Sequence, residues 1–162
     1  MDATGELDLL LHVLDQQRAA VLGKTEGLER EDLDRPHPPS TLTLSGLLHL
    51  LALAEEDWFE IHFAGQPDRE PFASADWKAD PDWQFRAAAG LSASDLRQRY
   101  RDACARGTAV VRAATSLDQL SAQPVRDEHF SLRWVLLHLI EETARHAGHA
   151  DLLREAIDGS TS

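Results

Sequence analysis

The sequence contains a single cysteine, Cys104, among its 162 residues. One cysteine cannot form a disulfide within the chain, and it cannot build a zinc cluster held by several thiolates. Because Cys104 falls in RDACARGTAV, a stretch typical of a helix, we expect a structural, half-buried thiol rather than a nucleophile. The reactive groups of this chain are therefore sought among other side chains.

Long apolar runs are also absent. No hydrophobic stretch reaches the roughly 18–20 residues that a membrane-spanning helix needs. The N-terminal segment MDATGELDLLL carries acidic residues where a secretory signal would carry basic ones. The composition, 43% hydrophobic, is that of a globular protein, and the length fits one domain, residues 1–162. We therefore expect a cytoplasmic, single-domain protein with no membrane partner.

Basic residues are scarce. The chain has 16 lysines and arginines against 28 aspartates and glutamates, a formal net charge of -12. This field would repel a phosphate backbone, and no local run of basic residues offsets it. Nucleic-acid binding is therefore not expected.

Four stretches have apolar residues at helical spacing. The predicted helices are Gly5–Leu22, Thr43 or Ser45 to Gly65, Ser92–Thr115, and Ser131 to Gly159. Serine, threonine and aspartate at the starts and glycine at the last end are typical caps. No strand pattern of useful length appears, so the sequence predicts an all-α fold, a four-helix bundle. Trp58 and Trp134 are expected in its core.

A long segment without helical pattern separates the second and third predicted helices, from Gln66 to about Ser92. It contains several prolines together with Trp77, Trp83 and Phe85. A loop of this length in a small domain is usually functional or packs as a lid. Alternatively, its aromatic side chains simply cover one end of the bundle.

Two residues of the last predicted helix suggest a metal site. Glu142 and His146 are four residues apart, so their side chains stack on one face of the helix. Both lie in or beside the apolar stripe of that helix, where an uncompensated carboxylate would be costly. A metal ion held by both side chains is one explanation, and a buried ion pair or hydrogen bond is the other.

Gly148 lies in the same predicted helix, where a glycine lowers helix stability by about 1 kcal/mol relative to alanine. Close approach of another helix or of a ligand would explain that glycine.

His49, on the second predicted helix, is the candidate for a third ligand. It lies at the margin of its apolar arc, and a partly exposed histidine without a special role is the alternative. Two histidines and one carboxylate would leave coordination positions open, as in catalytic sites. Zinc is the expected metal, with nickel, iron or manganese as alternatives. A zinc-bound water or thiol is deprotonated near neutral pH.

The segments SGLLHLLALAEEDWF and LRWVLLHLIEETARHAGHADLLREAIDG resemble the DinB-like superfamily of metal-binding four-helix bundles. The chain looks closest to the branch of mycothiol-dependent maleylpyruvate isomerase and thiol S-transferases. Much of the superfamily uses a histidine on the second helix and a His-x-x-x-His pair on the last one. Here Glu142 replaces the first histidine of that pair, and the set His49, Glu142 and His146 is similar to the isomerase branch.

The resemblance implies a divalent-metal-dependent S-transferase with mycothiol or a similar thiol as cosubstrate. The thiol would bind the metal as thiolate and attack a small-molecule electrophile. His149, Arg145 and Arg154 could contact the thiol, although surface salt bridges would also explain these residues. The resemblance also suggests a homodimer. A metal-dependent hydrolase using metal-bound water, and a non-enzymatic binding or stress-response module, remain the alternatives.

Overall fold

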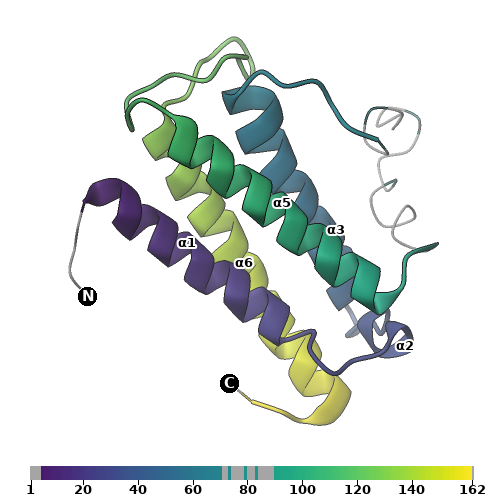
Figure 1. Cartoon of the computed structure of the whole chain (residues 1–162). Helices are drawn as coiled ribbons and strands as arrows, with labels where there is room; N and C mark the ends of the chain where they lie inside the picture. Colours follow the sequence, from purple (N-terminus) through teal and green to yellow (C-terminus); the bar gives the residue numbers. More distant parts are fainter. Residues whose placement is uncertain (1–4, 71–72, 74–78, 80–82, 84–89, 162) are drawn as a thin grey trace.

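The structure is a computed structural model that describes residues 5–70, 73, 79, 83 and 90–161. In chain order its elements are α1 (Glu6–Gly23), α2 (Arg30–Leu33), α3 (Leu44–Glu55), the π-helix η1 (Glu56–Phe63), α5 (Ala93–Ala113) and α6 (Leu132–Asp158). Because η1 continues α3 without a break, the long helices form four rods (Figure 1). The predicted all-α four-helix bundle is therefore confirmed.

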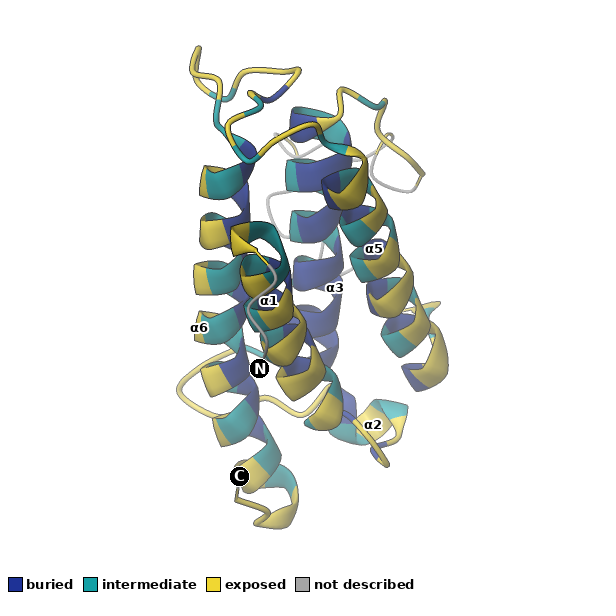
Figure 2. Ribbon diagram, turned by 60° about the vertical axis from the view of Figure 1, so that its left-hand side comes forward, coloured by how far each residue is buried: buried dark blue, intermediate teal, exposed yellow. Residues whose placement is uncertain are grey.

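The four rods pack as neighbouring pairs: α1 lies against α6, α3 against α5, and α3 against α6. Each of the outer helices turns a buried stripe inward and an exposed stripe outward (Figure 2). α3 differs, because nine of its 12 residues are buried. Its sequence is apolar on almost every side, which favours a central position. No helix among the described residues has the length and apolar character needed to span a bilayer.

The predicted caps form where the sequence places them. Thr43 Oγ1 accepts a hydrogen bond from the Gly46 amide at 3.1 Å, so Thr43 rather than Ser45 caps α3. Ser92 starts α5 with a capping box. Ser131 caps α6, and Gly159 ends it in the left-handed conformation with φ of 75°. These local signals set the helix boundaries within a few residues of the prediction.

The second rod changes its winding at Glu56. Residues of η1 turn more widely than an α-helix, as shown by the 3.0 Å hydrogen bond from the Ala64 amide to the Phe59 carbonyl. The wider turn keeps Glu56, Phe59 and Glu60 buried along one side. π-Helical turns are rare and occur often at functional sites. Neither η1 nor the short α2 was predicted.

An ion pair lies buried at the centre of the bundle. Arg18 of α1 donates to both carboxylate oxygens of Glu55 on α3, at 2.7 and 2.5 Å. Arg18 also donates to Thr108 of α5 at 3.0 Å, so three rods share one guanidinium. Burial alone would lower the pKa of Arg18, but the charge and hydrogen bonds of Glu55 raise it above its ordinary value. Burial raises the pKa of Glu55 as well, against the opposing charge and hydrogen bonds of Arg18, so the carboxylate depends on the guanidinium for its charge and the pair is structural.

Cys104 lies beside this pair. Its sulfur is 3.9 Å from Glu55 Oε1. Burial, and then the charge of Glu55, raise the pKa of the Cys104 thiol to about 12. A nucleophilic cysteine needs the opposite shift. The thiol is therefore structural, as expected.

The two tryptophans predicted in the core differ. Trp58 packs against the core cluster, whereas Trp134 is 39% exposed. The prediction for Trp134 was wrong, because its ring lies across the surface and stacks on Phe130 at 4.1 Å and on His138 at 5.0 Å. Stacking on neighbouring rings stabilises the indole without burying it completely.

Candidate functional site

Glu142 and His146 lie together on α6, as their spacing predicts. His146 Nε2 is 3.2 Å from Glu142 Oε1. The second carboxylate oxygen of Glu142 accepts from Arg145 at 3.1 Å. On its other side, His146 Nδ1 lies 3.3 Å from His149 Nδ1. These contacts form a short polar chain along one face of the helix.

The protonation of these side chains follows from their hydrogen-bond partners. Burial lowers the pKa of His146, against the opposing effect of Glu142, so the imidazole is neutral at pH 7. An ionised carboxylate can only accept a hydrogen bond, so Nε2 of His146 carries the ring proton and donates the hydrogen bond to Glu142. Nδ1 is then bare and accepts from Nδ1–H of His149. His149 thereby orients the ring of His146, and a metal ion at Nε2 would require the other tautomer, in which His146 Nδ1–H donates to Nδ1 of His149.

The pair also suits a metal ion. Metal–ligand bonds of about 2.1 Å in a tetrahedral site place neighbouring ligand atoms about 3.4 Å apart. The 3.2 Å between His146 Nε2 and Glu142 Oε1 is close to this value. A cation between these atoms would therefore need little movement of either side chain, provided that the ring proton of His146 moves from Nε2 to Nδ1. A neutral imidazole and a carboxylate are also ligands that zinc accepts.

His49 is buried in α3, with 1% of its surface exposed. The alternative of a partly exposed histidine is therefore wrong. Burial, and then the charge of Arg99, lower the pKa of His49 to about 4. His49 is consequently neutral at pH 7, which is the form that binds metals.

The elements that carry His49 and His146 are in contact. Leu48, next to His49, and Ala147, next to His146, belong to one buried cluster. Within residues 5–70, 73, 79, 83 and 90–161, however, no three His, Cys, Asp or Glu side chains gather closely enough to hold a metal ion. The structure thus brings Glu142 and His146 into contact, whereas the role of His49 as a third metal ligand stays a prediction.

The long segment before α5 also reaches His49. Trp83 places its ring 6.2 Å from the imidazole, tilted by 44°. Trp77 and Phe85, the other aromatic residues predicted to cover the bundle, lie outside the described residues. One aromatic residue of the long segment therefore lies beside a candidate ligand.

The three predicted thiol contacts have different positions. Arg145 is exposed and pairs with Glu141 and Glu142. Arg154 pairs with Asp158 at 2.8 Å and donates to the carbonyls of Lys24 and Glu26, which fastens α6 to the end of α1. Two of the three contact a candidate metal ligand directly: His149 contacts His146, and Arg145 contacts Glu142. Salt bridges therefore occupy both arginines, and their contact with a thiol stays a prediction.

Gly148 faces open space. A Cβ atom built on it would have no described atom within 4 Å, apart from its own helix backbone and chain neighbours. Close approach of another helix, one of the two explanations offered by the sequence, is therefore wrong for the described part of this chain.

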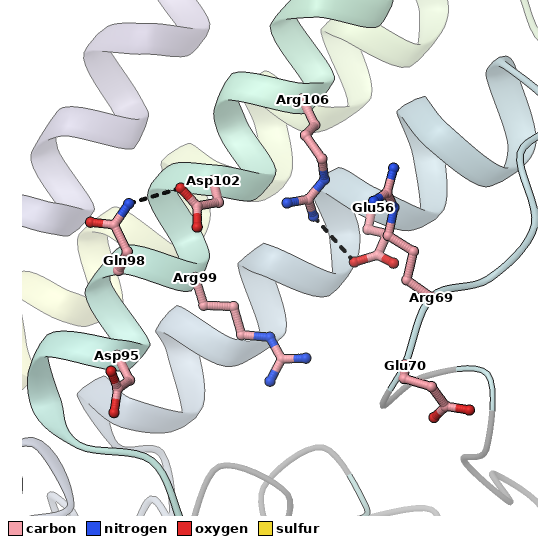
Figure 3. A pocket seen from close by; sticks show the side chains of 8 residues that line it. All are labelled: Glu56, Arg69, Glu70, Asp95, Gln98, Arg99, Asp102 and Arg106. Atoms are coloured by element: carbon pink, nitrogen blue, oxygen red, sulfur yellow. Dashed lines mark hydrogen bonds and ion pairs between the residues drawn. The ribbon is translucent and has the colours of Figure 1, made fainter.

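A second polar region was not predicted from the sequence. A cavity of about 290 Å³ lies between η1, α5 and residues 69–70 (Figure 3). Glu56, Arg99 and Arg106 line it, together with Gln98 and Asp102. The α5 residues recur at helical spacing, which would have indicated a shared face. The sequence could not show that Glu56, on another helix, lies opposite them.

Comparison with known proteins identifies the family and the fold. The family model described as mycothiol-S-transferase matches residues 9–159. Among solved structures, the crystal structure of a conserved protein from Enterococcus faecalis has a TM-score of 0.72 and 14% sequence identity. The alignment covers 98% of this chain and 100% of that protein, so the two share a fold. No curated protein matched.

The family match spans nearly the whole bundle, including both segments that carry the candidate ligands. The chain therefore belongs to the mycothiol-S-transferase family, a thiol S-transferase branch of the DinB-like superfamily.

Proposed function

We propose that this protein is a divalent-metal-dependent S-transferase that joins a low-molecular-weight thiol of the mycothiol type to a small electrophile. His49, Glu142 and His146 would hold the metal, with zinc as the first candidate. The observation that carries the proposal is the 3.2 Å contact between Glu142 and a neutral His146. Membership in the mycothiol-S-transferase family supports the thiol as cosubstrate.

A bound divalent metal would supply the positive charge that keeps a thiol in its thiolate form at neutral pH. The chain's own residues prepare the site. His149 holds the ring of His146 through their 3.3 Å contact. Arg145 orients the Glu142 carboxylate through its 3.1 Å contact. With His49 as the third ligand, its burial would also limit the access of water to the metal.

The reaction itself is a substitution at carbon. The thiol loses its proton to solvent, and its sulfur then forms a bond to the electrophilic carbon. The bond from that carbon to the leaving group breaks, and the leaving group departs with the bonding electron pair. No oxidant or reductant is required. Because the thiolate is the nucleophile, no serine or cysteine of the chain takes part, which agrees with the raised pKa of Cys104.

The direct test is conjugation of mycothiol to chlorodinitrobenzene by zinc-loaded protein, followed by absorbance. We expect turnover that depends on both zinc and thiol. Glu142→Ala should lose it, whereas Glu141→Ala, which changes the neighbouring exposed carboxylate, should retain it. Circular dichroism of both variants checks that the bundle is intact. If zinc-loaded protein neither binds nor conjugates the thiol at saturating concentration, the proposal is wrong.

Two further measurements separate the alternatives. Hydrolysis of nitrophenyl acetate without added thiol would point to a metal-dependent hydrolase with water as nucleophile. Absence of zinc uptake would point to a non-enzymatic binding module. The homodimer and the cytoplasmic location stay predictions from the sequence.

A further inference from the structure

Aromatic side chains gather where η1 contacts the first turns of α6. Trp58 of η1 lies against Trp134 and His138 of α6, with ring centroids 5.2 and 4.6 Å apart. Phe130, just before α6, stacks on Trp134 at 4.1 Å, and Trp134 stacks on His138 at 5.0 Å. The chain has four tryptophans, and two of them meet here. These four residues, Trp58, Phe130, Trp134 and His138, are called the aromatic cluster below.

The aromatic cluster has an inner and an outer layer. Trp58 and Phe130 pack against the buried core that η1 shares with α6. Trp134, by contrast, is 39% exposed, and Leu137 beside it on α6 is 51% exposed. Packing of the bundle therefore accounts for the inner layer, whereas the outer layer leaves apolar area in solvent. Exposed apolar area that borders a candidate site often marks the place where a ligand binds.

The aromatic cluster lies in line with the candidate metal ligands. Every fourth residue of α6, counted back from His146, belongs to one gently winding row: Glu142, His138 and Trp134. The rise of about 1.5 Å per residue places His138 about 6 Å and Trp134 about 12 Å from Glu142 along the helix axis. Both His138 and Glu142 are half-buried, so each is partly open to solvent. A small molecule can therefore rest on the aromatic cluster while its other end reaches Glu142 and His146.

The chemistry of the aromatic cluster favours a planar, aromatic molecule. Aromatic rings attract one another by offset stacking and by edge-to-face contact, in addition to the free energy gained from burying their apolar area. An aliphatic molecule of similar size would gain the hydrophobic contribution alone. The aromatic cluster therefore discriminates between the two kinds of molecule.

We propose that the aromatic cluster binds the aromatic part of the electrophile, with Trp134 and His138 as its principal contacts. It makes the protein selective for aromatic over aliphatic electrophiles. This assignment rests on the proposed function, because the reacting carbon must lie at the thiol beside Glu142 and His146. One helical turn, about 5.4 Å, separates that position from His138, which is within the reach of a single substituted ring.

Two electrophiles test the selectivity of the zinc-loaded full chain with mycothiol: chlorodinitrobenzene, which is aromatic, and iodoacetamide, which is aliphatic. Rates measured without protein are subtracted. We expect Trp134→Ala to lower kcat/KM for chlorodinitrobenzene about tenfold and to leave kcat/KM for iodoacetamide unchanged, because only the aromatic molecule loses a ring contact. Trp134→Phe should retain most of the wild-type value, since it keeps a ring. Leu152→Ala, which changes another exposed apolar residue of α6, is the control and should alter neither value.

Binding is measured separately on the metal-free full chain with meta-dinitrobenzene, which lacks the chloride leaving group. Ligand-observed NMR should show saturable binding to the wild type and to Leu152→Ala. Trp134→Ala should weaken this binding about tenfold. Circular dichroism and zinc uptake of each variant should match those of the wild type, because Trp134 is at the surface.

Three results would overturn the assignment: no binding of dinitrobenzene, equal binding by the wild type and Trp134→Ala, or an equal loss of kcat/KM for both electrophiles in Trp134→Ala. Failure of the proposed function gives a different result. Dinitrobenzene binding that depends on Trp134, without zinc uptake or thiol-dependent turnover, would confirm the aromatic site and refute the proposed function. Turnover that depends on zinc and thiol but not on Trp134 would do the reverse.

Discussion

Two carboxylates of this bundle face a basic partner, and their surroundings differ. Glu55 is 1% exposed and accepts two hydrogen bonds from Arg18, so both of its oxygens are satisfied. Glu142 keeps 22% of its side chain exposed and reaches a neutral imidazole at 3.2 Å. The first pair joins three helices, whereas the second lies within a single helix.

The difference separates a structural pair from a candidate ligand pair. A bidentate arginine leaves no room for another ion at Glu55, and removing either partner would strand a buried charge. At Glu142 the contact with His146 is a single hydrogen bond that a cation can replace. Fold stability should therefore depend on Glu55, and metal binding on Glu142.

The largest effect is expected at Glu55. Glu55→Ala leaves the buried Arg18 guanidinium with only the exposed carboxylate of Asp15, at 2.8 Å, as an ionic partner, which should lower the free energy of unfolding by about 3–5 kcal/mol. Urea denaturation followed by circular dichroism measures this. The double variant Arg18→Met with Glu55→Met should recover most of the loss, because no buried charge remains. Equal loss in the single and double variants would show that the pair matters only through packing.

A smaller loss is expected at Gly107, which packs against the same region. A Cβ atom there would lie 2.6 Å from the Phe59 ring and 2.8 Å from Glu55 Oε2. Gly107→Ala should therefore cost about 1–3 kcal/mol through overpacking, despite the better helix propensity of alanine. Thermal denaturation should show a lower Tm. An unchanged or raised Tm would mean that α5 can move away from η1 at little cost.

The pH dependence of stability should reflect the buried imidazoles. The pKa of His49 is about 4 in the folded protein and about 6.5 when unfolded, and the pKa of His146 is also lowered. Between these values the unfolded chain binds more protons, so the free energy of unfolding should fall as pH drops from about 6.5 toward 4.

Urea denaturation across this pH range, with chelator present, measures that slope. His49→Leu should make the free energy of unfolding fall less steeply as the pH decreases. His12→Gln, which changes an exposed histidine of α1, serves as the matched control and should leave the slope as it is in the wild type. A slope that is identical in all three proteins would mean that His49 is not kept neutral by the fold.

The smallest effect is expected at Gly148, beside the candidate ligands. Because a Cβ there meets open space, Gly148→Ala should raise the free energy of unfolding by about 0.5–1 kcal/mol. Thermal denaturation of the metal-free protein measures this. Zinc uptake should be unchanged. If thiol binding to the zinc form is lost in this variant, the glycine is required for approach of a ligand, the explanation that remains.

Much of this fold could be predicted from local signals. The caps at Thr43, Ser92 and Ser131 and the glycine after α6 depend on nearby residues only, so the sequence contains the necessary information. The Glu142–His146 contact could be predicted for the same reason, because both residues share one helix.

Features that depend on contacts between helices could not be predicted in this way. The partner of Arg18 is 37 residues away in the chain, and Glu56 and Arg106 are separated by 50. The π-helical turn of η1 could not be predicted either, because its residues would suit an α-helix equally well. Trp134 was misplaced because its hydrophobic ring suggested burial, whereas stacking on Phe130 and His138 leaves it at the surface.

The central claim is that Glu142 and His146 hold a metal ion, and metal content tests it most directly. The protein would be purified without chelator or metal-affinity tag, exposed to zinc, dialysed and measured by elemental mass spectrometry. We expect about one zinc per chain in the wild type and in Glu141→Ala, and almost none in Glu142→Ala and His146→Ala. His49→Ala would show whether the third ligand is needed. No zinc in the wild type, or equal zinc in the wild type and Glu142→Ala, would contradict the claim and leave Glu142 and His146 as a structural pair.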